Sequence, residues 1–163
     1  MADLETSYLA VRGALVDAIK TAWSPVKIYF DPFDLPEDYA GGYPVVFIDA
    51  RITAWENETP KTDEVVIAFD VTGIFANDVT NGNDAGMVAN LTAAQAELYG
   101  VANMGNYGYL GQMSDAQLLR FDGNKRYGCA FTYQCSLSID RRIFRATSAL
   151  VHNATTFAAT ATA

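Results

Sequence analysis

Histidine, the residue most often used as a general base, occurs once in the sequence, as His152 in a segment of small residues. A serine or cysteine nucleophile needs such a base beside it. Any nucleophilic site would therefore depend on that single segment, and an incidental surface histidine is the favoured interpretation. We expect no catalytic residue and no enzymatic activity.

Carboxylates that could bind a cation stand in two short segments. Residues 31–38 contain two prolines and four irregularly spaced acids, which are Asp31, Asp34, Glu37 and Asp38. Residues 77–84 have the composition of a calcium-binding loop, but alignment on Gly82 puts Val79 and Val88 at ligand positions. We expect neither segment to bind a metal.

Glycines and cysteines have the wrong spacing for a cofactor or a metal. Gly105, Gly108 and Gly111 lie three residues apart, but no predicted strand leads into them and no phosphate-loop lysine follows. Cys129 and Cys135 occupy one predicted strand, where six residues span about 20 Å, too far for a disulfide. We expect no cofactor, and two buried free thiols in a reducing compartment.

Charge is divided unevenly along the chain. The 163 residues have a net charge of −8, but residues 1–119 hold seventeen acids and five bases, whereas residues 120–145 hold two acids and six bases. We interpret the bases around the last strand and the acids of residues 31–38 as complementary intersubunit surfaces. These bases are Lys125, Arg126, Arg141, Arg142 and Arg145. The alternatives are a solvated surface charged by chance and a weak phosphate-binding patch; the acidic balance argues against sequence-specific nucleic-acid binding.

Composition indicates one globular domain, with 50% hydrophobic and 18% charged residues. No apolar run reaches the roughly 18 residues that a membrane span requires. The first residues lack the basic and apolar regions of a secretory signal, so we expect a cytoplasmic protein.

Apolar periodicity predicts the elements of the first half of the chain. Residues 4–22 have helical spacing, with Asp3 as N-cap and a stop at residues 24–25. Residues 26–30 indicate a short strand. Residues 43–55 and 64–75 predict an antiparallel hairpin with a long exposed loop between them.

The second half continues with a helix, whose apolar residues recur at helical spacing from Met87 to Val101. Residues 103–114 are interpreted as a loop and residues 118–121 as a short strand. Residues 127–139 alternate strictly, with the apolar side chains at odd numbers, which predicts one buried face and one solvent- or partner-facing face. Asp49, Arg51 and Asp70 fall within strands, where cross-strand ion pairs account for them.

The predicted order is α-β-β-β-α-β-β, an α+β domain over residues 1–145 in which two helices pack on one face of a mostly antiparallel twisted sheet. Residues 146–163 form a C-terminal extension with seven alanines and five threonines. Small side chains bury little apolar area, so we expect this extension to order only against a neighbouring subunit.

The chain resembles the tail terminator, or tail completion, proteins of long-tailed bacteriophages over about residues 4–142. The resemblance rests on the N-terminal helix, the acidic proline-rich loop, the strands starting at Tyr43 and Glu64, and the long last strand ending at Asp140-Arg141. It implies a non-enzymatic structural subunit that forms a homo-hexameric ring on the head-proximal end of the tail tube. There it would end tube polymerisation and join the tail to the neck.

The resemblance also implies partners and a location. The partners are copies of the chain itself, the tail tube protein and a neck or head-closure protein, without membrane. The location is the virion, with host cytoplasm during assembly. Alternatives are another head–tail neck component, such as a head-closure or adaptor protein, and a small-ligand-binding α+β domain.

Overall fold

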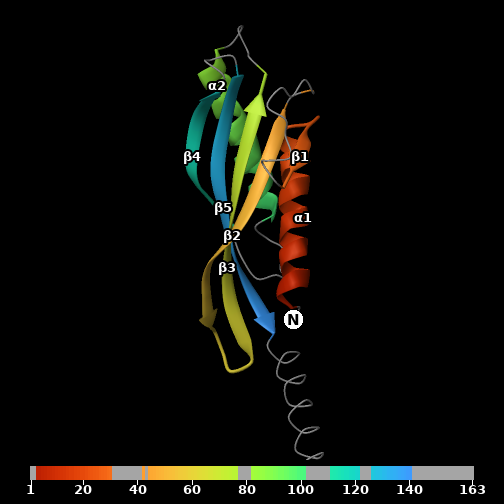
Figure 1. Ribbon diagram of the computed structural model, residues 1–163, viewed down its shortest axis with the longest axis vertical. Coiled ribbons are helices and arrows are strands. Elements are labelled where there is room, and N and C mark those ends of the chain that lie inside the picture. Colours follow the sequence, from red (N-terminus) through yellow and green to blue (C-terminus); the bar gives the residue numbers. More distant parts are fainter. Residues whose placement is uncertain are drawn as a thin grey trace, which may run out of the picture.

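The computed structural model describes residues 3–30, 42, 44–76, 82–101, 111–121 and 126–140. These residues form one five-stranded sheet and two helices (Figure 1). In chain order the elements are α1 (Leu4–Ala22), β1 (Lys27–Tyr29), β2 (Val45–Asn57), β3 (Thr62–Phe75), α2 (Asn83–Val101), β4 (Gln112–Phe121) and β5 (Arg126–Asp140). The predicted element order and the α+β class are confirmed.

The sheet has the strand order β1-β2-β3-β5-β4. Strand β1 pairs with β2 in parallel, and the other neighbours are antiparallel. Helices α1 and α2 contact each other and both contact β5, so they cover the same face of the sheet. In Figure 1 the β2–β3 hairpin and the end of β5 extend past the first turn of α1.

Helix α1 begins and ends where the sequence predicts. The Asp3 carboxylate accepts a hydrogen bond from the Thr6 backbone N–H at 2.8 Å, which lowers the pKa of Asp3. At the other end, the indole N–H of Trp23 donates to the Asn90 carbonyl at 2.9 Å. This bond joins the end of α1 to the middle of α2, and so fixes the two helices relative to each other.

The core lies between the helices and the odd-numbered residues of β3 and β5. The strand residues that it buries are Val65, Ile67, Phe69, Val71, Cys129, Phe131, Tyr133, Cys135, Leu137 and Ile139. They meet Val11, Leu15 and Ile19 of α1 and Ala94 and Leu98 of α2. The predicted face assignment of the last strand is therefore confirmed.

Two predicted boundaries are wrong. The long loop at residues 56–63 is a tight turn of residues 58–61, because β2 continues to Asn57 and β3 starts at Thr62. Strand β4 starts at Gln112, six residues before the predicted Leu118, so residues 112–114 are strand and not loop. A β-bulge between Ser114 and Gln117, with Asp115 at φ 51°, breaks the alternation that would have indicated the strand.

Gly111 is required where the chain enters β4. A Cβ atom at this position would overlap the Tyr133 ring, which is buried beneath it. Burial raises the pKa of Tyr133 to about 12, and its hydroxyl is hydrogen-bonded to the Gly111 backbone. The last glycine of the three therefore allows close packing of two strands.

Replacing Phe131 tests the assignment of the β5 faces. Phe131→Ala removes a buried ring and should cost about 3–5 kcal/mol of unfolding free energy. Gln134→Ala, on the opposite and exposed side of the same strand, should change it by less than about 0.5 kcal/mol. Urea denaturation measures both values, and equal losses would contradict the assignment.

Replacing Gly111 tests the close approach to Tyr133. Gly111→Ala should destabilise the protein by about 1–3 kcal/mol, because the buried Tyr133 has to move. Gly13→Ala is the matched control: Gly13 is exposed in α1 with open space around it, and alanine there should stabilise by about 0.5–1 kcal/mol. A Gly111 variant as stable as the wild type in thermal melts would refute the packing argument.

Candidate functional site

Of the predicted interface residues, Arg126 alone falls within the described part of the chain, as the first residue of β5. The others lie outside the described residues: Lys125, Arg141, Arg142, Arg145, Asp31, Asp34, Glu37 and Asp38. The 15 residues of β5 span about 46 Å at 3.3 Å per residue. Lys125 and Arg126 therefore stand at one end of this long strand in the chain. Arg141, Arg142 and Arg145 follow its other end.

The acidic segment and the first group of bases leave the sheet at different margins. Residue 31 follows β1, the strand at one edge, whereas residue 125 joins β5 beside β4 at the other edge. Along the strand order, β2 and β3 lie between β1 and β5. The acidic segment and Lys125 are thus connected to strands that β2 and β3 separate.

The face of the sheet opposite the helices, here called the helix-free face, carries a polar network. Arg51 of β2 and Asp70 of β3 form a salt bridge of 3.0 Å, which confirms the predicted cross-strand pairing for these two residues. The prediction is wrong for Asp49, whose carboxylate accepts a hydrogen bond from the Ala50 backbone N–H. The Thr132 hydroxyl of β5 donates to the other oxygen of Asp70 at 2.7 Å. Although this face was expected to be solvent- or partner-facing throughout, Thr132 is 8% exposed.

Further carboxylate–hydroxyl pairs follow toward the end of the sheet. The Ser136 hydroxyl donates to Glu64 of β3. The Ser138 hydroxyl donates to Glu58 at 2.6 Å. Three hydroxyl residues at even-numbered positions of β5 therefore each bind one carboxylate from β3 or the β2–β3 turn.

The network stabilises Asp70 as an anion. Burial acts to raise the pKa of Asp70, but the hydrogen bonds from Arg51 and Thr132 and the charge of Arg51 outweigh it, so the pKa is lowered. A carboxylate held in this way is a poor proton acceptor near neutral pH. The arrangement therefore suits a structural role better than acid–base chemistry.

The two cysteines are free and buried, as predicted. Burial raises the pKa of each thiol to about 12, which suppresses the reactive thiolate. Within the ranges that the structure describes, no group of three or more histidine, cysteine or acidic side chains could hold a metal ion.

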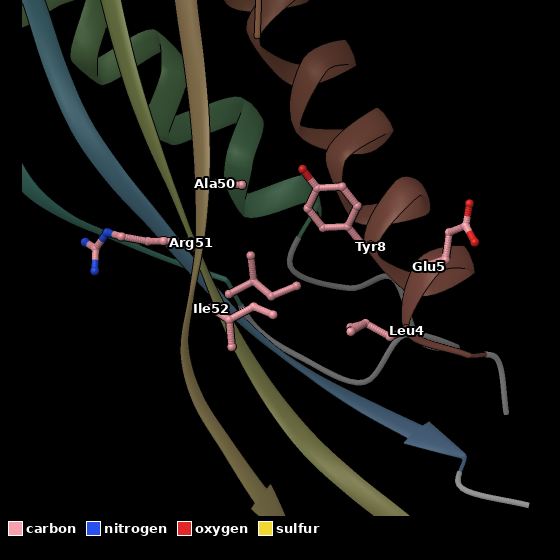
Figure 2. Close-up of a pocket in the computed structure, with 7 residues that line it drawn as sticks. Leu4, Glu5, Tyr8, Ala50, Arg51 and Ile52 are labelled. Carbon is pink, nitrogen blue, oxygen red and sulfur yellow. The ribbon is translucent and has the colours of Figure 1, made fainter. Parts of the chain in front are cut away.

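An open pocket of about 510 Å³ lies between the first turns of α1 and the middle of β2 (Figure 2). Its apolar walls are Leu4 and Tyr8 of α1, Ala50 and Ile52 of β2, and Ile67 of β3. Figure 2 shows Leu4 and Tyr8 directed toward β2, whereas Glu5 points outward from the helix and Arg51 leaves the far side of the strand. We call this feature the α1–β2 pocket.

Sequence reasoning missed both the pocket and Thr132, the second partner of Asp70. The sequence did contain a signal for the network, because acidic residues of one predicted strand can pair with serine and threonine residues of its neighbour. No sequence pattern predicts the pocket, because its existence depends on the distance between α1 and β2.

Comparison with protein-family models and with curated proteins found no match. In the described ranges, neither helix combines the length and the hydropathy that a membrane crossing needs.

Replacing Asp70 tests the helix-free network. Asp70→Ala should cost about 1 kcal/mol at pH 7, because the buried Thr132 hydroxyl loses its acceptor. Because the pKa of Asp70 is lower in the folded than in the unfolded protein, its carboxylate contributes fully to stability above the unfolded-state pKa of about 3.9. This contribution is lost as the pH falls through the folded-state pKa. The difference from wild type should therefore shrink below about pH 4.

Asp49→Ala is the matched control, because Asp49 is exposed and its carboxylate accepts only from the adjacent Ala50 N–H among the described groups. Its cost should stay within about 0.5 kcal/mol. Denaturant midpoints from pH 2 to pH 7 measure both variants. The stabilising role of the network would be contradicted if the two variants lost equal unfolding free energy at pH 7. It would also be contradicted if the loss in Asp70→Ala were the same at pH 2 as at pH 7.

Proposed function

We propose that this chain is a structural virion subunit that forms a ring of identical copies at the head-proximal end of a phage tail tube. The ring, expected to be a hexamer, ends tube polymerisation and joins the tail to the neck. The α-β-β-β-α-β-β order, on which the resemblance to tail terminators rests, supports this proposal.

The observation that carries the proposal is the unlike character of the two margins of the sheet. At one margin, β1 covers only Val45–Phe47 of β2 and leads into the acidic residues 31–38. At the other, β4 is bulged at Asp115, and its connection to β5 contains Lys125. A head-to-tail ring needs two different surfaces that fit each other on one subunit.

Large apolar side chains are exposed on both β2 and β4. Trp55 of β2 and Leu118 of β4 are each about half exposed, although both are large and apolar. The Trp55 indole N–H donates to Asp63 at 3.0 Å, which holds the ring in place. Exposed ion pairs contribute only about 0.2–1 kcal/mol each, so charge sets the orientation and rate of association while apolar contacts supply affinity.

Reversing the bases after β5 tests the electrostatic part of this assembly. The variant Arg141→Glu, Arg142→Glu, Arg145→Glu should assemble more slowly or fail to assemble, and raised salt should slow the wild type. Reversal of Asp31, Asp34, Glu37 and Asp38 to lysine in the same chain should partly restore assembly. Light scattering across a salt series follows all three proteins.

The control is Lys20→Glu, Lys61→Glu, which reverses exposed bases in α1 and in the β2–β3 turn. It should assemble like the wild type. Unchanged assembly of the arginine variant, or equal loss in the control, would refute electrostatic pairing between copies.

A further inference from the structure

The α1–β2 pocket is apolar surface that the described residues leave open. Ile52, which lines it, is 53% exposed, while Ile67, which also lines it, is buried. Tyr8 stacks on Phe69 with ring centroids 5.8 Å apart, so the pocket continues directly into the core. An apolar opening of this kind between a helix and a sheet can bind apolar side chains.

The described chain ends within reach of this pocket. Ile67 lies beside Cys135 in the sheet, and Asp140, the last residue of β5, is five residues farther along. Five residues cover about 17 Å, so residues 141–145 can return from Asp140 to the level of Ile67. In Figures 1 and 2 the end of β5 lies near the first turn of α1, which forms one wall of the pocket.

The residues that follow have the composition of a suitable occupant. Residues 146–163 contain no aspartate, glutamate, lysine or arginine, and their large apolar residues are Leu150, Val151 and Phe157. Residues 31–41 are the other nearby candidate, but their four acids would meet Glu5 at the rim of the pocket. Like charges disfavour that occupant.

The sequence alone predicts that residues 146–163 order only against a neighbouring subunit; from the pocket we propose instead that they fold back on their own chain and insert apolar side chains into the α1–β2 pocket. Attachment to β5 makes the contact intramolecular, with an effective concentration in the millimolar range for a short linker. The contact would cover Ile52 and Leu4 in the single subunit. It does not depend on ring formation, so it can be tested where the chain is monomeric.

Disulfide trapping tests this placement in the full chain at low protein concentration. Glu5→Cys at the rim, combined with Ala149→Cys or Ala158→Cys, should form a cross-link within one chain upon mild oxidation. Lys61→Cys with the same tail cysteines is the control, because residue 61 adjoins Thr62, the neighbour of Asp140, and does not line the pocket. The native cysteines are buried and should stay unreacted.

Cross-linking at residue 5 should be about tenfold faster than at residue 61, or more. Equal rates, or a faster reaction at residue 61, would overturn the proposal. Disulfide-linked dimers in place of cross-linked monomers would also overturn it, and would assign the pocket to the segment of a neighbouring copy.

A second measurement uses a change in the pocket itself. Ile52→Asp should abolish amide hydrogen-exchange protection of residues 146–163 and slow the cross-link at residue 5. Leu9→Asp is the matched control, since Leu9 is 46% exposed on α1 and does not line the pocket. An unprotected segment in the wild type, or equal effects of the two variants, would refute the proposal, whether or not the chain forms rings.

Discussion

Burial of one face of the β3–β5 pair by both helices is the interaction on which the other features depend. The two strands pair along the whole of β3, from Thr62 to Phe75, and their odd-numbered side chains fill the core. Successive side chains of a strand point to opposite faces of the sheet, so placing the odd-numbered residues in the core places the even-numbered residues on the other face. The polar network of Asp70 and Thr132 therefore lies on the helix-free face as a consequence of core packing.

The same constraint explains which parts of the fold could be predicted from the sequence. Helix α1, the hairpin and the face of β5 are encoded in regular apolar spacing over many residues, and their types were confirmed. The start of β4 was hidden because its bulge at Asp115 interrupts that spacing. The sequence predicts too long a turn between β2 and β3, because Asn57 and Thr62 are polar residues that nevertheless belong to the strands.

The candidate site was less predictable, for physical reasons. Arg51 and Asp70 could be paired from the sequence since both fall in adjacent strands, but Thr132 required the exact register of β5 against β3. The α1–β2 pocket depends on how far the first turns of α1 stand from Ile52, and no local pattern encodes that distance. The predicted charged surfaces belong mostly to segments outside the described residues, so they stay predictions.

The proposed ring requires each subunit to present different surfaces on its two sides. Native mass spectrometry of the purified full-length chain, with negative-stain imaging of the same sample, tests that claim most directly. We expect closed rings of one stoichiometry, with six copies, whose population grows with protein concentration and falls with salt. A chain that stays monomeric at every concentration, or forms only two-fold dimers with identical surfaces in contact, would contradict it.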